Sequence, residues 1–139
     1  MLRRPGYHLG PHRDPKRSIA TCLLYFARPG DREDYGTEIY RVLDDGEASY
    51  TQTYYPSQEG RTCELVKVVP YRPNSMLAFL NSYGAHGANI PRDAPPTLER
   101  YSCQFYVGPD GGALADLISR LAPERQALWQ SKKEEVGQY

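Results

Sequence analysis

Two residues near the N-terminus have the types and the spacing of a pair of metal ligands. In the segment "YHLGPHRDPKR", His12 and Asp14 are two positions apart, and residues so spaced in an extended chain point to the same side. They can therefore offer an imidazole nitrogen and a carboxylate oxygen to one ion. His-x-Asp is a common tripeptide, however, and it also suits a polar turn in which His12 hydrogen-bonds the backbone.

A third candidate ligand lies far along the chain, in "MLAFLNSYGAHGANIP". His86 is flanked on both sides by glycine and alanine, so its backbone can approach another strand closely and nothing bulky shields its ring. It could complete a set of two imidazoles and one carboxylate. The alternative is a structural histidine that hydrogen-bonds within the fold.

An arginine and a serine share one face of a later segment, "ERYSCQFYVG". Strand alternation puts Arg100 and Ser102 on the same side. If that side faces inward, Arg100 needs an anionic partner, because an unpaired buried charge costs several kcal/mol. A carboxylate bound by the guanidinium fork and the hydroxyl would meet this need. Alternatively, Arg100 reaches solvent at the end of a strand or pairs with Glu99.

The elements that must position these residues are mainly β-strands. Short apolar or alternating runs, bounded by glycine, proline, aspartate and asparagine, recur up to about residue 107, and this pattern is typical of an antiparallel sandwich or barrel. The abundance of tyrosine, 12 residues against 3 phenylalanines, also favours strands. We predict strands over 6–12, 18–27, 36–43, 48–55, 63–69, 75–80, 84–88 and 99–107.

The pattern becomes helical after the turn that follows residue 107. Leucine, isoleucine and alanine recur at helical spacing from Ala113, and Pro123 is well placed to begin a second helix. We expect a helical tail over 113–135, packed on the outside of the sheet. A chain of 139 residues has the size of one domain, so we assign residues 1–139 to a single domain.

Charge and composition exclude several kinds of partner. Lysine plus arginine equals aspartate plus glutamate, 17 each, so nothing indicates binding to nucleic acid or an anionic membrane. No segment approaches the roughly 18 apolar residues of a membrane span. The three cysteines have no CxxC spacing and lie among strand-like neighbours, where a thiol is usually buried. We expect a soluble, cytoplasmic protein.

His-x-Asp, a distal histidine and Arg-x-Ser in this order resemble the iron(II)- and 2-oxoglutarate-dependent dioxygenases, particularly the prolyl-hydroxylase-like group. The phrases "PHRDPKR" before "CLLYF", "YGTEIYR" and "VVPYRPNSMLAFLNSYGAHG" fit this group too, and the similarity spans about residues 6–107. The resemblance implies a double-stranded β-helix (jelly roll or cupin-like) with a helical tail. It further implies residue roles: iron(II) on His12, Asp14 and His86, and 2-oxoglutarate held by Arg100, with help from Ser102 and Tyr7.

The implied reaction uses dioxygen and 2-oxoglutarate, releases succinate and carbon dioxide, and hydroxylates a substrate. That substrate would be a small molecule, a peptide or a glycan, bound between loops 28–35, 44–60 and 89–98, and no catalytic residue beyond the metal ligands is required. The other hypothesis is a non-catalytic, cupin-like module that binds a metal or another ligand. An oxygenase needs Arg100 to face the metal, whereas a binding module does not.

The chain departs from the family pattern in two places. Only eleven residues precede His12, where the family has a helical region and a first barrel strand. We therefore expect either a chain shortened at its N-terminus or a barrel completed in another way, and an open edge would invite a second copy to form a homodimer. The interval from His86 to Arg100 is also long and contains Arg92, a competing arginine that we assign to a loop.

Overall fold

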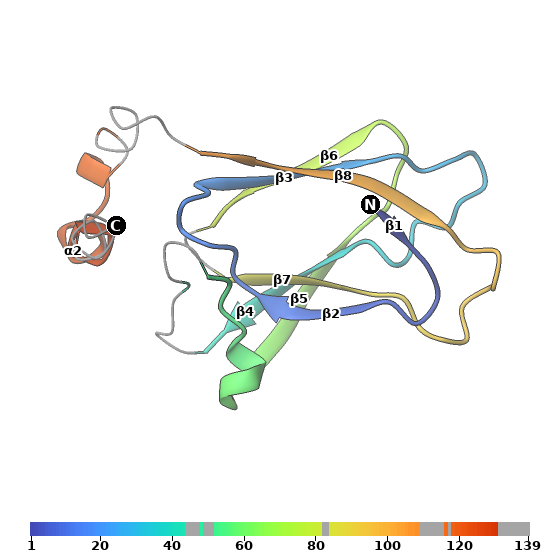
Figure 1. Ribbon diagram of the computed structural model, residues 1–139, viewed down its shortest axis with the longest axis horizontal. Helices are drawn as coiled ribbons and strands as arrows, with labels where there is room; N and C mark the ends of the chain where they lie inside the picture. Colours follow the sequence, from blue (N-terminus) through green and yellow to red (C-terminus); the bar gives the residue numbers. More distant parts are fainter. Residues whose placement is uncertain (44–47, 49–51, 82–83, 109–115, 117, 131–139) are drawn as a thin grey trace.

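The protein is mainly β, with two antiparallel four-stranded sheets that face one another (Figure 1). The computed structural model describes residues 1–43, 48, 52–81, 84–108, 116 and 118–130 of the chain. Within these residues the two sheets form separate layers, and no closed barrel is present. The candidate site residues lie in the space between the layers.

Each sheet combines strands from distant parts of the chain. The first has the order β1-β8-β3-β6, and the second has the order β2-β7-β4-β5. The strands of the first sheet are β1 (Leu2–Arg3), β8 (Arg100–Val107), β3 (Ala20–Tyr25) and β6 (Ser75–Leu80). Those of the second are β2 (His8–His12), β7 (Ala85–Asn89), β4 (Thr37–Val42) and β5 (Cys63–Val69).

The predicted strand over 48–55 is the one that the structure does not bear out. Residues 49–51 lie outside the described residues, and the described part of this range forms only an isolated bridge between Tyr54 and Arg13. A 3-10 helix, η1 (Pro56–Glu59), follows at once, with Pro56 in its first turn and Gly60 in the left-handed conformation at its end. Proline and glycine therefore begin and end this turn directly after Tyr55.

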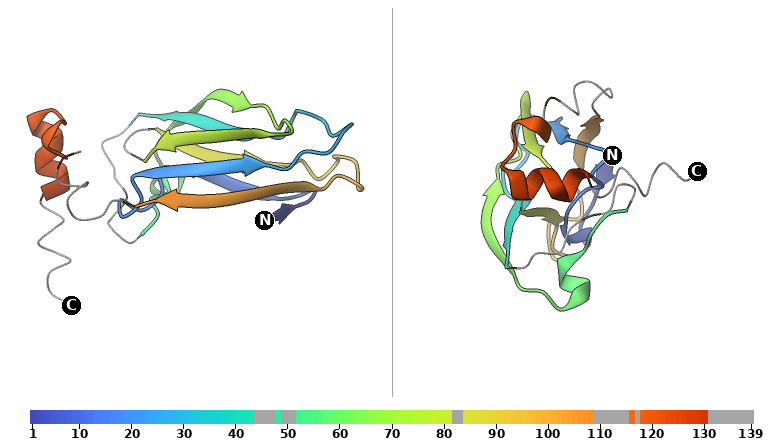
Figure 2. Two further views of the ribbon diagram at one scale, coloured as in Figure 1. Left: turned by 90° about the horizontal axis from the view of Figure 1, so that it is seen from above. Right: turned by 90° about the vertical axis from the view of Figure 1, so that its left-hand side faces the viewer.

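The helical tail is present in part. Helix α2 spans Pro123–Gln130 and begins at the proline expected to open it. Residues 109–115, 117 and 131–139 of the predicted tail lie outside the described residues. Helix α2 lies beyond one end of the two sheets, not over an outer face as we expected (Figure 2). Among the described residues, no helix has the length and apolar character needed to cross a bilayer.

The space between the sheets holds a small apolar core and an unusual number of polar side chains. The core is built on Leu23, Tyr25 and Tyr71. Charged and polar residues are rarely buried without partners or a function. This interior nevertheless contains Arg3, His12, Asp14, Thr21, Thr37, Asn81, His86, Arg100 and Ser102, all buried. The space between the sheets therefore combines a small apolar core with polar side chains of the kinds that form binding sites.

The outer side of the first sheet is apolar, and the described residues leave much of it exposed. Alternation along its three long strands directs a set of residues outward that we call the outer apolar face: Ala20, Cys22, Leu24, Met76, Ala78, Leu80, Tyr101, Cys103, Phe105 and Val107. Leu80 is 64% exposed and Phe105 is 43% exposed. The expectation that all three cysteines are buried holds only for Cys22, since Cys63 is half-buried and Cys103 is exposed.

Candidate metal centre and anion site

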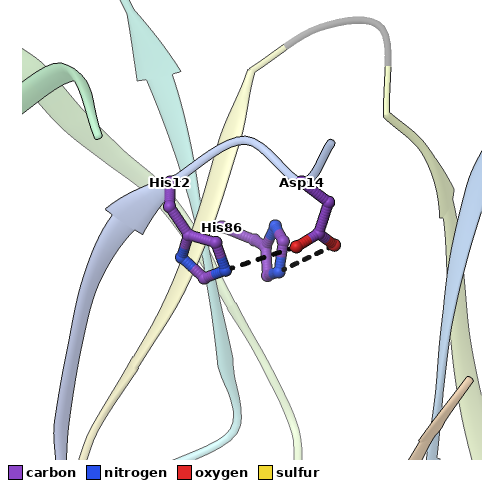
Figure 3. A group of neighbouring side chains, drawn as sticks. All are labelled: His12, Asp14 and His86. Atoms are coloured by element: carbon purple, nitrogen blue, oxygen red, sulfur yellow. Dashed lines mark ion pairs between the residues drawn. The ribbon is translucent and has the colours of Figure 1, made fainter. Parts of the chain in front are cut away.

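Strand pairing brings the three predicted metal ligands together. His12 at the end of β2 and His86 in β7 are direct partners in the antiparallel ladder. Asp14 follows His12 by two positions, so its carboxylate returns to the same point between the sheets. Figure 3 shows the two rings and the carboxylate converging, and all three side chains are buried.

The distances suit a single metal ion. Asp14 Oδ1 lies 3.7 Å from His12 Nε2, and Asp14 Oδ2 lies 3.6 Å from His86 Nε2. The three ligand atoms all lie within 4.8 Å of one another. Two ligand atoms bound at right angles about 2.1 Å from an ion are roughly 3 Å apart, so small rotations of these side chains would close the site on a metal.

A backbone contact prepares His12 to bind through Nε2. Its Nδ1 lies 2.9 Å from the carbonyl oxygen of Gly10. Because a carbonyl only accepts hydrogen bonds, Nδ1 carries the proton and donates it. In the neutral ring Nε2 then has a free lone pair, and it is Nε2 that faces Asp14. Such an orienting contact is typical of metal-binding histidines.

Asp14 is held by a hydroxyl from the opposite sheet. Thr21 in β3, which is fully buried, donates from Oγ1 to Asp14 Oδ2 at 2.5 Å. The side chain of Asn81 lies behind it, with Oδ1 3.0 Å from Thr21 Oγ1 and Nδ2 donating to the carbonyl of Ser18. This chain of contacts fixes the carboxylate and ties the metal site to both sheets.

Small residues around His86 allow β2 and β7 to approach closely. An added Cβ at Gly87 would lie only 2.7 Å from the carbonyl oxygen of Leu9 in β2. This position therefore accepts glycine alone while the two strands keep their spacing. The expected close approach of the His86 backbone to another strand is confirmed, and Ala85, Gly87 and Ala88 are all buried. The expectation that nothing bulky shields the ring is wrong, because the rings of Phe79 and His12 pack against it.

The surroundings of His86 favour its neutral form. Burial is the main cause that lowers the pKa of His86 to about 3, and the nearby charges of His12 and Arg3 lower it further. The ring also packs against Phe79, with the ring centroids 4.6 Å apart. A neutral imidazole is the form that binds a metal.

His12 and His86 line a cavity of about 80 Å³. Its walls also include Ile39, Phe79 and Arg13, so apolar surface and a cation border the metal ligands together. A second, smaller cavity lies on another side of His86 and is lined by Arg3, Leu9, Leu23, Thr37, Gly87, Ala88 and Gln104. His86 therefore separates two hollows in the interior.

Arg100 and Ser102 lie on the same face of β8, as strand alternation predicted, and this face points inward. Arg100 is 1% exposed and Ser102 is 3% exposed. Within the described part of the chain, Nε, Nη1 and Nη2 of Arg100 and Oγ of Ser102 are buried without a hydrogen-bond partner. The guanidinium lies over two aromatic rings, 4.7 Å from the centroid of Tyr71 and 5.5 Å from that of Tyr25.

The two alternatives for Arg100 do not hold. The side chain does not reach solvent, and Glu99 pairs with Arg4 at 2.9 Å and with Arg28 at 3.7 Å instead. Burial lowers the pKa of Arg100 to about 10. Tyr25 acts in the opposite direction and raises this pKa, whereas the charge of Arg3 lowers it further. The guanidinium is therefore a buried cation at neutral pH, and none of the described residues accepts a hydrogen bond from it.

Of the remaining sequence candidates, Tyr7 lies near the site and Arg92 lies at the surface. Tyr7 precedes β2 and is half-buried, and its ring lies 4.8 Å from Cζ of Arg3. Its charge interaction with Arg100 places it near the predicted carboxylate site. Arg92 is exposed, in agreement with its assignment to a loop.

Sequence reasoning missed Arg3 and Thr21. Arg3 belongs to β1, a strand of two residues with no pattern to reveal it. Thr21 lies in an apolar run, "IATCLLYF", where a threonine is an ordinary strand residue. Only the pairing of distant strands reveals what either side chain contacts.

Comparisons with models of known protein families, with curated proteins and with solved structures found no match to this chain.

Proposed function

We propose that this protein is an iron(II)- and 2-oxoglutarate-dependent dioxygenase that hydroxylates a small-molecule, peptide or glycan substrate. One observation carries the proposal: a buried His-Asp-His group lies between the same two sheets as a buried Arg-x-Ser pair whose side chains have no hydrogen-bond partner among the described residues. A structural metal site would account for the first group but not for the second. A metal and a carboxylate-bearing cosubstrate would account for both.

The strand order supports the finer description of the fold as a double-stranded β-helix. Strands that alternate between two facing four-stranded sheets are the arrangement of a jelly roll. Here the chain passes from β1 in the first sheet to β2 in the second, and from β3 back to β4, while β7 and β8 return to the positions beside β2 and β1. The metal ligands lie on the second sheet and next to it, and the Arg-x-Ser pair lies on the first.

The donor set fits iron(II). Two imidazoles and one carboxylate leave three coordination positions open, which is the arrangement of non-haem iron oxygenases and differs from a saturated structural zinc site. Bound iron(II), with 2-oxoglutarate and dioxygen, would supply the oxidation of an unreactive C–H bond with release of succinate and carbon dioxide.

The protein's own residues would bind, orient and exclude water. Arg100 would donate two parallel hydrogen bonds to the distal carboxylate of 2-oxoglutarate, and Ser102 would donate a third. Asp14, fixed by Thr21, and His12, fixed by Gly10, would hold the metal in place. No separate general base is needed for this chemistry.

The larger cavity beside His12 and His86 is the proposed entrance for substrate. It borders both histidines, and its apolar wall of Ile39 and Phe79 would keep water from the reacting atoms. Of the loops predicted as its walls, 28–35 and 89–98 lie at the other end of the sheets, because Asn89 pairs with His8 and not with His12. The described part of 44–60 is the proposed wall: Tyr54 bridges Arg13 and Tyr55 stacks on His12, while residues 44–47 and 49–51 lie outside the described residues. We place the reaction in a reducing compartment, the cytoplasm, because the three cysteines form no disulfide with one another and have no CxxC spacing.

An anaerobic titration tests the proposal. Iron(II) and 2-oxoglutarate added together to the protein should give the weak visible charge-transfer band of the metal chelate. The band should be lost in His86→Ala and should need far more 2-oxoglutarate in Arg100→Ala. His8→Ala and Arg41→Ala, which alter exposed residues of the same types, should leave the titration unchanged.

The outcomes separate the two hypotheses. A band together with succinate formation in air supports the oxygenase. A protein that binds iron(II) but gives no band, with Arg100→Ala identical to the unmodified chain, is the metal-binding module instead.

A further inference from the structure

Arg3 is a second buried guanidinium beside the proposed carboxylate site. It is 5% exposed, and it pairs directly with Arg100 in the antiparallel β1–β8 ladder. Side chains directly opposite each other on neighbouring strands are about 5 Å apart at Cβ, and like charges at such positions repel. The fold thus holds two cations close together in its interior.

The described residues do not compensate for this pair. Nε of Arg3, like the three nitrogens of Arg100, is buried without a hydrogen-bond partner, and Nη2 of Arg3 lies 3.8 Å from the thioether of Met1, a weak acceptor. The ring of Tyr7 offers Arg3 a cation–π contact, and the rings of Tyr25 and Tyr71 offer Arg100 two more; each contributes about 0.5–2 kcal/mol. Each buried charge without an anionic partner costs several kcal/mol, and the two cations also repel each other, so these contacts do not replace an anion.

Arg3 also lies between the other two parts of the site. It lines the smaller cavity together with His86, so the guanidinium borders a metal ligand on one side and Arg100 on the other. The cavity is only about 10 Å³, about enough for one water molecule. Arg3 and Gln104 are the long side chains on its wall, and a change of rotamer in either would widen it for a ligand.

We propose that Arg3 is a second anion-binding residue of this pocket, and that Arg3 and Arg100 together select a dicarboxylate over a monocarboxylate. Two guanidinium groups match two carboxylates in charge, with Arg100 at the far end of the ligand and Arg3 at the end beside His86. The proposal rests on the proposed function only in identifying the dicarboxylate as 2-oxoglutarate. The selectivity itself requires no metal.

Metal-free protein and two four-carbon acids test this directly. Succinate carries two charges and butyrate carries one, and chloride keeps the ionic strength equal. Succinate should raise the melting temperature at lower concentration than butyrate does. In Arg3→Met, which keeps the apolar stem, the affinity for succinate should fall about 10- to 100-fold, as expected for a lost charge-assisted hydrogen bond, while the affinity for butyrate changes little.

Arg4→Met is the matched control, because Arg4 is the next residue and its side chain is 65% exposed. It should retain the preference for succinate, and Arg3→Met without ligand should be at least as stable as the unmodified chain, since one of two like charges is gone. An unchanged preference for succinate in Arg3→Met would overturn the proposal. The proposal would also be overturned if Arg3→Met lost affinity for succinate and butyrate equally and melted at a lower temperature, because a purely structural role of Arg3 would give that result.

The result is independent of the oxygenase test. Succinate selectivity that depends on Arg3, without a chelate band, would leave the dicarboxylate pocket standing and remove the oxidation. A chelate band that forms equally well in Arg3→Met would support the oxygenase and remove the proposed role of Arg3.

Discussion

His12 and His86 occupy directly opposed positions in the β2–β7 ladder, with their ring centroids 4.1 Å apart. This pairing makes the geometry of the metal site a property of strand register. A slip of one residue in either strand would turn one imidazole to the other face of the sheet. The site and the second sheet are therefore expected to form together.

The close approach of β2 and β7 can be tested at Gly87. In Gly87→Ala the new Cβ would meet the carbonyl of Leu9 at 2.7 Å, so β2 must move away and carry His12 with it. We expect weaker metal binding and a lower melting temperature. Gly108→Ala, whose new Cβ finds its nearest atom at an ordinary 3.5 Å, should change neither. Normal metal affinity in Gly87→Ala would contradict this account of the strand spacing.

Thr21 should increase the affinity for the metal by orienting Asp14. Thr21→Val keeps the shape of the side chain but removes the hydroxyl that donates to Asp14 Oδ2. Loss of such an orienting contact commonly lowers metal affinity 10- to 100-fold, and isothermal calorimetry with manganese(II) would measure it. Thr62→Val, at an exposed position, serves as the control. Equal affinities for the two variants would show that Asp14 is held in another way.

The metal-free protein should lose stability in mild acid because of His86. Its pKa in the folded chain is about 3, below the value of about 6.5 in the unfolded chain. As the pH falls from 6.5 towards 3, the unfolded state therefore takes up a proton that the folded state does not. The free energy of unfolding should decrease by up to about 1.4 kcal/mol per pH unit across this window, with no effect of this group above it.

Urea denaturation between pH 7 and pH 4.5 would measure that slope. The groups that face His86 are His12, Asp14 and Arg3, so the control alters none of them. His86→Gln should flatten the dependence, whereas His8→Gln, on the exposed side of β2, should leave it unchanged. Identical slopes for all three proteins would remove His86 as the cause.

The outer apolar face predicts self-association of two copies. Its exposed side chains offer on the order of 600 Å² per copy, near the lower limit for a stable interface, and it carries no charge that would oppose a like face. Sedimentation velocity should show a dimer that Phe105→Lys and Leu80→Lys each weaken. Leu65→Lys, at an exposed position in the other sheet, should not. A monomer at every concentration would contradict the prediction.

Local patterns predicted much of the fold and most of the candidate site. That Arg100 and Ser102 share one face followed from alternation within a single strand, and the pair His12 and Asp14 followed from spacing within a single segment, but the sequence left open whether that shared face points inward. Arg3 and Thr21 could not be found in this way, because their roles depend on which distant strand lies beside them. The range 48–55 had strand-like residues, but its described part pairs with a neighbour only through the single bridge between Tyr54 and Arg13.

One residue of the outer apolar face gives the chain a built-in reporter. Cys103 is an exposed free thiol, and it follows Ser102 in β8 while pointing to the opposite side of the sheet. In a Cys63→Ser background, which removes the half-buried thiol of β5, a maleimide dye would react at Cys103 faster than at the buried Cys22, and anything that covers the face would slow the reaction. The rate of alkylation thus measures coverage of the face without altering a residue of the interior.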